Sequence, residues 1–273
     1  MKPARLFILT LTAMIAFASN SLLCRLALKQ TVIDAASFTL IRLLSGALVL
    51  WLIVRARKVS WPQAGNWASA LALFTYAAAF SFAYISLSAG TGALLLFGAV
   101  QATMILWGLR QDERLQSIQV VGLTMASSGL VVLLFPGLSA PPVGGTILML
   151  GAGVAWGVYS LRGKTGGDPI VATAGNFLRA VPFAAVLSVV LLKSARLDLA
   201  GLGYAVVSGA LTSGLGYVIW YGALPGLKAA GAATVQLSVP VLTAAAGILL
   251  LGEQLPGAFS SLPCSFSAAL RWS

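Results

Sequence analysis

The sequence is 273 residues long, 59% of its residues are hydrophobic and 8% are charged, and its formal net charge is +11. A soluble domain carries roughly 25% charged residues, so this chain lacks the polar surface that would let it face water on all sides. The composition excludes a soluble globular protein and predicts an integral membrane protein.

Apolar runs of membrane length follow one another along the chain. At roughly 20 residues per crossing, the length leaves room for about ten helices. Nine runs fit this length approximately, at 6–26, 35–54, 67–87, 90–109, 117–135, 145–161, 170–192, 201–223 and 229–251. A tenth, at 256–270, is broken by Pro263, is rich in serine and falls short of a clear span. The sequence therefore predicts an all-α membrane protein of about ten transmembrane helices, with the last helix left open.

The basic residues are distributed unevenly between alternate loops. With the N-terminus in the cytoplasm, the outer loops hold four, Arg25, Lys29, Lys193 and Arg196. The cytoplasmic loops and the two chain ends hold eleven, Lys2, Arg5, Arg55, Arg57, Lys58, Arg110, Arg114, Arg162, Lys164, Lys228 and Arg271. This asymmetry follows the positive-inside rule, so it indicates a cytoplasmic N-terminus and not a nucleic-acid-binding surface. The basic start and Ala16-Phe17-Ala18 also resemble a cleaved signal peptide, but the charge count requires the first helix to remain.

One membrane-length stretch occurs twice in the chain. The run at 229–251 aligns with residues 89–111, and each copy contains a glutamine, Gln236 or Gln101. The lipid interior does not tolerate an unpaired amide, so both glutamines are expected to face the inside of the bundle. A repeated helix of this kind predicts a repeated half, with the two copies as facing walls of a cavity.

The second half is expected to be inverted with respect to the first. A stretch rich in proline and glycine at 135–145 reads as a linker, which divides the chain into five-helix repeats at 1–137 and 138–273. Because five is an odd number, the second repeat must enter the membrane from the opposite side. Inverted repeats of this type place a binding site between the halves, near the membrane midplane, and let one half move against the other.

Two helices of the first half carry polar or aromatic side chains on one face. In the first run, Phe17 and Asn20 share a face, and Asn20 either makes an interhelical hydrogen bond or contacts a substrate. In the third run, Tyr76, Phe80 and Tyr84 recur at i, i+4 and i+8. Such a stripe is either packing or one wall of a wet cavity, in which the tyrosine hydroxyls find partners.

Arginines occur inside one apolar run of each half. Arg42 and Arg179 lie eight and eleven residues after Asp34 and Asp168, which begin their segments. A guanidinium inside a membrane must find carbonyls, a carboxylate or water. Its recurrence in both halves favours a structural pin between helices over a substrate anchor.

Pro240 stands in the second copy of the repeated stretch where the first copy has Val100. A proline leaves the carbonyl four residues earlier, that of Gln236, without its helical hydrogen bond and provides a kink point. We therefore expect the helix at 229–251 to move more than its counterpart, with Pro240 as a gating or structural residue.

The sequence offers few residues that could bind a metal or a cofactor or catalyse a reaction. Histidine is absent, and Cys24 and Cys264 are far apart, so neither a disulfide framework nor a metal or cofactor site is expected. Without a histidine or a buried carboxylate pair, an intramembrane enzyme is not expected either. The six acids lie at or near helix ends, which favours uncoupled transport, because a proton-driven antiporter usually keeps a titratable group at mid-membrane.

Two helix ends carry a family resemblance. The run at 90–109 opens Gly90-Thr91-Gly92-Ala93 and is followed by Asp112-Glu113-Arg114, and the run at 229–251 ends Leu250-Leu251-Gly252-Glu253-Gln254. Together with the two halves and their arginines, these segments resemble the drug/metabolite transporter superfamily, and in it the EamA-type ten-helix transporters. The resemblance covers about residues 4–255, and its nearest subfamily is the YddG-type exporters of aromatic and other neutral amino acids.

The resemblance implies a central cavity lined by the first, third, fourth, sixth, eighth and ninth helices. At the matching positions, the side chains expected to bind the substrate are Phe17, Asn20, Tyr76, Phe80, Phe97, Gln101, Trp156, Tyr159, Tyr217, Tyr221 and Gln236. Aromatic faces suit an apolar side chain, while amides and hydroxyls suit the charged groups of a zwitterion.

The expected function is export of small neutral metabolites, most of all amino acids including aromatic ones, across the bacterial inner membrane by alternating access. The alternative is a multidrug efflux transporter of the same superfamily, although lipophilic cations would want a carboxylate in the cavity. A membrane scaffold that transports nothing would not need polar groups on mid-membrane faces in both halves. The expected partners are the substrate and membrane lipid, without nucleic acid, and the protein is expected to be a monomer.

Overall fold

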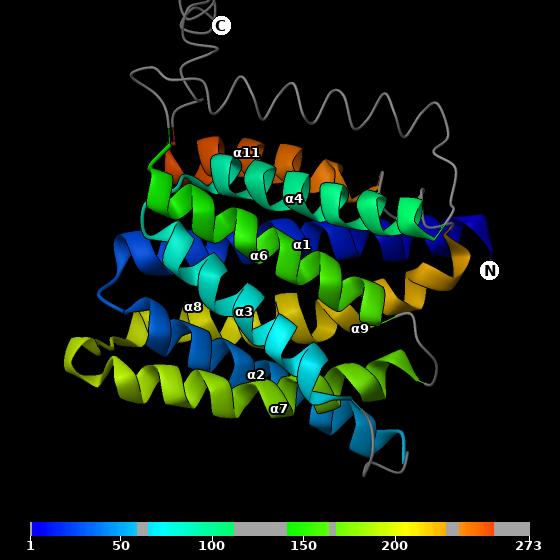
Figure 1. Ribbon diagram of the computed structural model, residues 1–273, viewed down its shortest axis with the longest axis horizontal. Helices are drawn as coiled ribbons and strands as arrows, with labels where there is room; N and C mark the ends of the chain where they lie inside the picture. The colour runs from blue at the N-terminus through cyan, green and yellow to red at the C-terminus, as the bar shows by residue number, and fades with distance from the viewer. Residues whose placement is uncertain (1, 59–64, 112–140, 164–167, 228–234, 254–273) are drawn as a thin grey trace, which may run out of the picture.

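The computed structural model describes residues 2–58, 65–111, 141–163, 168–227 and 235–253. In these residues every regular element is helical, and the long helices lie side by side in one bundle (Figure 1). In chain order the elements are α1 (Pro3–Gln30), α2 (Ala35–Ala56), α3 (Trp67–Tyr84), α4 (Ala89–Arg110), α6 (Val143–Arg162), α7 (Pro169–Val190), η1 (Leu192–Ser194), α8 (Leu199–Val207), η2 (Ser208–Leu215), α9 (Gly216–Ala223), η3 (Leu224–Gly226) and α11 (Ser238–Leu251).

Seven helices in the described residues are long and apolar enough to cross a membrane. They are α1, α2, α3, α4, α6, α7 and the continuous segment Leu199–Gly226, which contains α8, η2, α9 and η3. The prediction of an all-α membrane protein is confirmed for this part of the chain. The runs at 117–135 and 256–270 and the boundary between the halves lie outside the described residues, so the count of ten helices stays a prediction.

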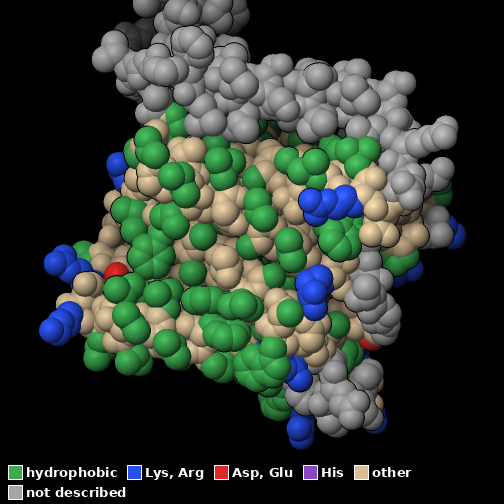
Figure 2. Space-filling view, viewed as in Figure 1, with side chains coloured by type: hydrophobic (Ala, Val, Ile, Leu, Met, Phe, Trp, Pro, Cys, Tyr) green, Lys and Arg blue, Asp and Glu red, His purple; other side chains and the backbone are tan. Residues whose placement is uncertain are grey.

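The surface of the bundle is apolar where a soluble protein would be polar. Large hydrophobic side chains such as Phe7, Leu48, Val186 and Leu249 are more than half exposed. Figure 2 shows hydrophobic side chains across the middle of one face, with lysines and arginines toward the ends. Exposed aliphatic side chains over a core that contains amides and hydroxyls are typical of a protein whose surroundings are lipid.

Polar side chains set where several helices begin. Carboxylates cap α2, α7 and α8, where Asp34, Asp168 and Asp198 accept backbone N–H groups of the first turn at 2.8 to 3.2 Å. Asn66 caps α3 at 2.8 Å and Ser88 caps α4 at 3.3 Å. These caps satisfy N–H groups that have no partner within the helix. These three aspartates therefore lie at helix ends, as the sequence predicts.

The helices run in both directions along the bundle, and their ends gather in two groups (Figure 1). At one end of the bundle, which we call the Glu253 end, Glu253 at the end of α11 bonds to residues near the end of α1 and at the start of α4. At the other, Arg57 joins the end of α2 to the start of α7, and this is named the Arg57 end. Both α4 and α6 run from the Glu253 end toward the Arg57 end.

α1 is longer than its sequence pattern predicted. Arg25 was expected in the loop after the first run, but α1 continues to Gln30 and Arg25 is a helical residue that is only 7% exposed. The prediction of a loop position is wrong because α1 continues past Arg25, and the guanidinium is buried there because it has a carboxylate and two carbonyls as partners, described below. A charge that is paired and hydrogen-bonded can be buried, and no local sequence pattern reports the pairing.

The long segment between η1 and η3 changes its helical form in the middle. It is π-helical over Ser208–Leu215 and packs there against α2. A Cβ on Gly209 would overlap the Arg42 carbonyl and the Ser45 hydroxyl, so the two helices meet backbone to backbone. The wider turn of a π-helix shifts the angular position of every later residue, and such segments are frequent at functional sites.

α4 and α6 also approach each other closely. A Cβ on Gly153 would overlap the Leu96 carbonyl and lie 2.6 Å from the Cβ of Ala99, and one on Gly157 would lie 2.8 Å from the Cβ of Thr103. Two small residues four apart let helix backbones pack without a hydrophobic driving force between them, which lipid does not supply. This contact fixes two walls of the cavity described below.

Replacing Gly153 by valine is expected to separate α4 from α6 and to lower the melting temperature of the detergent-solubilised protein. Overpacking a close contact costs about 1–3 kcal/mol. Gly151→Val is the matched control, because it lies on the same helix and no atom lies within 4 Å of a Cβ at that position. Thermal unfolding followed by circular dichroism measures both variants, and equal melting temperatures would contradict the contact.

Candidate functional site

A narrow cavity lies at the centre of the described bundle, between segments of the two sequence halves. Its walls come from α1, α3, α4, α6, η2 and α9. The lining residues are Phe17, Asn20, Ser21, Tyr76, Phe80, Leu96, Phe97, Trp156, Thr212 and Tyr217. Its volume is about 10 Å³, which is room for about one water molecule. The lining side chains therefore fill nearly all of the space between the helices at this point.

Trp156 stands at the centre of the aromatic lining. Its ring centroid lies 6.0 Å from that of Phe17, 5.0 Å from that of Tyr76 and 4.9 Å from that of Tyr217. The ring of Tyr159, on the same helix, lies 5.6 Å away. Tilted and edge-on pairs at these distances contribute about 0.5–1.5 kcal/mol each beyond their buried area. One indole thus holds α1, α3 and α9 against α6.

The polar wall of the cavity is built around Asn20. Its Oδ1 accepts hydrogen bonds from the hydroxyls of Ser208 (2.7 Å) and Thr212 (3.2 Å), and its Nδ2 donates to the Tyr76 hydroxyl at 3.3 Å. The Ser208 hydroxyl is the donor that places Oδ1 toward η2, because the Thr212 hydroxyl has a single proton and also donates it to the Ser208 carbonyl, at 2.7 Å. Asn20 therefore makes the interhelical hydrogen bonds that the sequence left as one option, and its side chain lines the cavity as well.

Arg42 lies directly behind this wall and is 1% exposed. Its Nη2 donates to the Tyr76 hydroxyl at 3.1 Å and its Nε to the Ser213 hydroxyl at 3.2 Å. The guanidinium carbon lies 5.2 Å from the ring centroid of Tyr76 and 5.1 Å from that of Phe80. Through these contacts Arg42 ties α2 to α3 and η2, as a structural pin does.

Arg179 has a different setting from its counterpart in the first half. It is half-buried, and its Nη1 donates to the Gly175 carbonyl of its own helix at 3.1 Å. Arg42, by contrast, bonds to neighbouring helices at the cavity wall. The two arginines recur in the sequence, but Arg42 is buried at the cavity wall whereas Arg179 is half-buried, so their environments differ.

Pro240 is the third residue of α11, in the first turn of the helix. The helical residues before it are interrupted at Leu237, directly after Gln236. Proline has no N–H for the Gln236 carbonyl, which agrees with the position of the break. A gating role for Pro240 stays a prediction.

Seven of the eleven side chains expected to bind a substrate line the cavity: Phe17, Asn20, Tyr76, Phe80, Phe97, Trp156 and Tyr217. The other four do not: Gln101, Tyr159, Tyr221 and Gln236. Both glutamines are buried elsewhere in the protein, at 6% and 3% exposure. The sequence pattern missed Ser21, Leu96 and Thr212. Of these, Thr212 follows the π-helical register, which a straight helical period does not predict.

The described residues of α11 contribute nothing to the cavity lining. The first copy lines the cavity through Leu96 and Phe97, whereas residues 235–251 of the second copy do not, and residues 229–234 lie outside the described residues. The expectation of two facing walls is therefore not met by the described part of the second copy. Instead α4 and α11 pack directly on each other, where a Cβ on Gly90 would lie 3.0 Å from the Cβ of Ala244. Small residues on both helices allow this contact and leave no space for a cavity between them.

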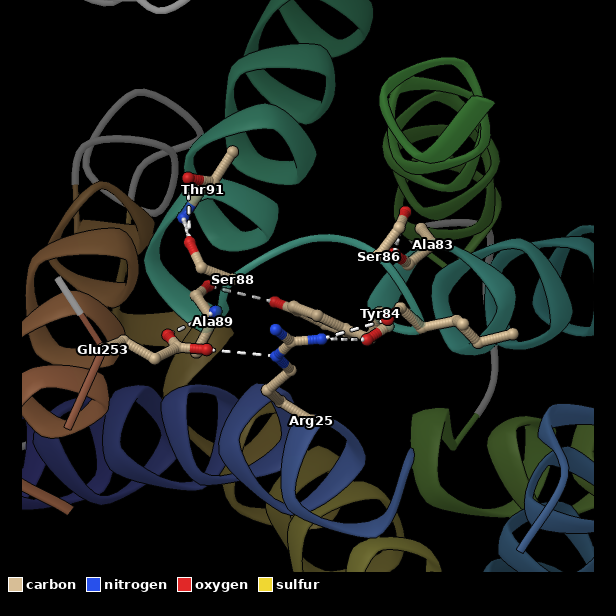
Figure 3. Close-up of polar contacts among 9 residues, drawn as sticks. Arg25, Ala83, Tyr84, Ser86, Ser88, Ala89, Thr91 and Glu253 are labelled. Carbon is tan, nitrogen blue, oxygen red and sulfur yellow. Dashed lines mark hydrogen bonds and ion pairs between the residues drawn. The ribbon is translucent and has the colours of Figure 1, made fainter. Parts of the chain in front are cut away.

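A cluster of polar contacts closes the Glu253 end. Arg25 Nε lies 3.0 Å from Glu253 Oε1, and the other carboxylate oxygen accepts the Ala89 N–H at 2.8 Å. Arg25 Nη1 donates to the carbonyls of Tyr84 (2.8 Å) and Ile85 (3.2 Å). Figure 3 shows the guanidinium between the Glu253 carboxylate and the end of α3. This cluster is named the Glu253 seal, and its two charged side chains are 9% and 16% exposed.

Gly252 sets the position of Glu253. It ends α11 in the left-handed conformation, with φ at 62°, and the Glu253 N–H then bonds back to the Gly247 carbonyl at 3.2 Å. No atom lies within 4 Å of a Cβ at position 252, so the conformation and not the space calls for glycine. The Gly-Glu pair at the end of α11 thus turns a carboxylate toward Arg25.

A second contact joins segments at the Glu253 end. The Asp34 N–H donates to the Arg196 carbonyl at 3.1 Å, and the Arg196 N–H donates to Asp34 Oδ2 at 2.9 Å. Burial raises the pKa of Asp34, but hydrogen bonds from Ser37, Arg196 and Ala36 outweigh it, and the pKa lies below its ordinary value. This contribution to stability is therefore present above the ordinary aspartate pKa and is lost as the pH falls through the lowered value.

The Arg57 end is closed by weaker contacts. Arg57 Nη1 lies 3.2 Å from Asp168 Oδ2, and these side chains are 47% and 38% exposed. The Asn66 N–H donates to Asn176 Oδ1 at 2.9 Å, and Arg162 Nη2 donates to Asn66 Oδ1 at 3.2 Å. Exposed ion pairs contribute about 0–1 kcal/mol, so this end depends less on charge than the Glu253 end. Each contact joins the first half of the sequence to the second.

Comparison with known proteins finds similarity to membrane transporters. Residues 143–258 match the EamA-like transporter family. Two uncharacterized transporters of Archaeoglobus fulgidus are similar to the chain. One is 27% identical over 211 residues, which is 75% of this chain and 75% of that protein. The other is 26% identical over 271 residues, which is 93% of this chain and 91% of that protein.

A much stronger similarity is to an uncharacterized protein of Pseudomonas aeruginosa. It is 59% identical over 256 residues, which cover 93% of this chain and 89% of that protein. A crystal structure of a protein 20% identical to this chain superposes with a TM-score of 0.50 and covers 89% of this chain and 98% of that one. At that identity the superposition indicates a shared fold and nothing about the substrate.

Proposed function

We propose that the chain is an EamA-like transporter, because residues 143–258 match that family and two transporters are 27% and 26% identical to it. We propose further that it exports small neutral metabolites, most of all amino acids including aromatic ones, across the bacterial inner membrane by alternating access. The cavity is the observation that carries the proposal, because rings, hydroxyls and an amide from both halves meet there. Aromatic faces suit an apolar or aromatic side chain, while hydroxyl and amide groups suit an amino acid's charged groups.

The two closed ends support alternating access. A cavity of about 10 Å³ holds no amino acid, so the walls must separate before a substrate enters. Opening at the Glu253 end breaks the Glu253 seal, and opening at the Arg57 end breaks the contacts of Arg57 and Asn66. Transport follows if each end opens only while the other is closed.

The packing of the helices supports inverted repeats. α3 packs on α6, and α1 packs on the segment that contains α8, η2 and α9, which is the same contact with the halves exchanged. In the same way α4 packs on α6 while α1 packs on α11, and α3 packs on α7 while α2 packs on η2. α2 pairs with α7 and α4 with α11, which lie at corresponding places in the two halves. A two-fold axis in the membrane plane would produce this pattern.

The basic residues support a cytoplasmic Arg57 end. The described lysines and arginines at that end are Lys2, Arg5, Arg55, Arg57, Lys58, Arg110 and Arg162, seven residues. Four lie at the Glu253 end, Arg25, Lys29, Lys193 and Arg196. Because cytoplasmic segments carry the excess of positive charge, the N-terminus is proposed to lie in the cytoplasm.

Counterflow in proteoliposomes tests the proposal. Vesicles loaded with unlabelled L-phenylalanine are expected to accumulate labelled L-phenylalanine, and neutral amino acids are expected to compete, whereas protein-free vesicles accumulate none. Tetraphenylphosphonium, a lipophilic cation, is expected not to compete. If the cation competes and no amino acid does, the amino-acid proposal fails and multidrug efflux takes its place.

A further inference from the structure

The buried guanidinium of Arg42 has no opposite charge beside it in the described parts of the chain. The four described carboxylates, Asp34, Asp168, Asp198 and Glu253, all serve helix ends. Arg42 Nη1 has no hydrogen-bond partner among the same residues. Hydroxyls and ring faces hold the remaining guanidinium atoms. A buried charge compensated only by neutral groups is unfavourable, and an anion beside it removes much of that cost.

The hydrogen bonds around Tyr76 determine where this charge acts. Its hydroxyl oxygen accepts from Arg42 Nη2 at 3.1 Å and from Asn20 Nδ2 at 3.3 Å, and these two bonds occupy both lone pairs. The hydroxyl proton therefore points to neither residue, and no described residue accepts it. Because a donor that itself accepts from a cation is polarised, this proton is a strengthened hydrogen-bond donor. Tyr76 lines the cavity.

Two other polar groups of the cavity lining can also donate hydrogen bonds, as the Tyr76 hydroxyl does. Asn20 Nδ2 has a second hydrogen beyond the one that it gives to Tyr76, because its Oδ1 is the atom that takes the hydroxyls of η2. The Tyr217 hydroxyl, also in the lining, has no partner among the described residues. The cavity lining therefore contains several hydrogen-bond donors, and the positive charge of Arg42 lies directly behind them.

We infer that the cavity holds its substrate by a carboxylate, which accepts hydrogen bonds from the Tyr76 hydroxyl and the Asn20 amide and is stabilised by the buried Arg42 guanidinium behind them. The inference rests on the proposed function and narrows it, from neutral metabolites in general to those that carry a carboxylate. Arg42 acts through Tyr76 as a positioning residue that confers selectivity. The same charge repels cationic substrates, which bear no group for these donors.

Ligand binding, measured without transport, tests the inference. The probes are L-phenylalanine, 3-phenylpropionate, which keeps the carboxylate and lacks the ammonium group, and L-phenylalaninamide, which lacks the carboxylate. Their apparent affinities are taken from the thermal stabilisation of the detergent-solubilised protein. The two carboxylates are expected to bind roughly tenfold or more tightly than the amide, since hydrogen bonds to a charged group have about this effect.

Variants separate the inferred role of Arg42 from a purely structural one. In Arg42→Gln the preference for a carboxylate over the amide is expected to fall to within about twofold, and Arg42→Lys, which keeps the charge, is expected to keep part of it. Arg179→Gln is the matched control, because it also removes a guanidinium from a transmembrane helix, and it is expected to keep the full preference. Tyr76→Phe keeps the ring and removes the hydroxyl, so it tests the same contact if Arg42→Gln does not fold.

Three results would overturn the inference: wild-type protein that binds the amide as tightly as the acids, wild-type protein that binds neither acid, or folded Arg42→Gln and Tyr76→Phe variants that keep the preference. Failure of the proposed function gives a different result. If no amino acid undergoes counterflow but 3-phenylpropionate still binds the wild type and not Arg42→Gln, the carboxylate site stands and amino-acid export does not.

Discussion

Replacing Glu253 by glutamine is expected to open the Glu253 end and to accelerate hydrogen exchange in the first turn of α4 by roughly 100-fold. The Ala89 N–H bonds to the Glu253 carboxylate, and Arg25 has that carboxylate as its ion-pair partner. Glutamine leaves Arg25, whose side chain is 9% exposed, without its opposite charge. Removing one partner of a buried pair costs about 3–5 kcal/mol. The free-energy difference that favours the closed conformation of the Glu253 end over the open one therefore becomes much smaller.

Hydrogen exchange measured by mass spectrometry in detergent checks this expectation at the start of α4. Arg57→Gln is the control, because it breaks the ion pair of the opposite end, whose side chains are 47% and 38% exposed. That variant is expected to leave the exchange of α4 unchanged, since an exposed pair contributes about 0–1 kcal/mol. Unaltered protection of the Ala89 amide in Glu253→Gln would show that the seal does not hold this end.

The same variant is expected to transport poorly. Alternating access requires the Glu253 end to close while the Arg57 end is open, and without the seal the protein remains open at one end. Binding of 3-phenylpropionate is expected to persist, because Glu253 does not line the central cavity. Loss of transport with binding retained would distinguish a closing defect from damage to the cavity.

Trp156→Ala is expected to have the second large effect, on stability and on binding together. The indole is 5% exposed and contacts rings of α1, α3 and α9, so its removal leaves a void where these helices meet. Replacing a buried tryptophan by alanine costs about 3–5 kcal/mol. Counterflow of L-phenylalanine is expected to be lost, because the aromatic wall for its side chain is gone, while Trp156→Phe is expected to keep most of it.

Trp107→Ala is the matched control for this variant. Trp107 lies on α4 and is 50% exposed, so its loss removes the same side chain from the outside of the bundle. We expect its melting temperature and its counterflow to remain close to those of the wild type. Thermal unfolding and the counterflow assay measure all three variants. If Trp156→Ala transported phenylalanine at the wild-type rate, the cavity would not be the substrate site.

The sequence by itself determined the membrane-spanning helices. Lipid imposes the same requirement on every segment, namely about twenty apolar residues with all backbone groups bonded within the helix, so each helix leaves a local signal. The acids at helix ends are local for the same reason, since a cap bonds to residues two or three positions away. The aromatic and polar faces of α1 and α3 could also be predicted, because residues three and four apart share a side of a helix.

Only the tertiary structure decided which side chains meet. Arg25 and Glu253 are 228 positions apart, and neither gives a local sign of the other, so Arg25 was placed in a loop. The π-helical turn moved Thr212 to the cavity, because it shifts the register that a straight helix would keep. Arg42 and Arg179 look alike in the sequence, but only the packing of α2 on α3 and η2 turns Arg42 into a buried charge behind Tyr76. A charge derives its role from its neighbours, and in this protein those neighbours come from distant parts of the chain.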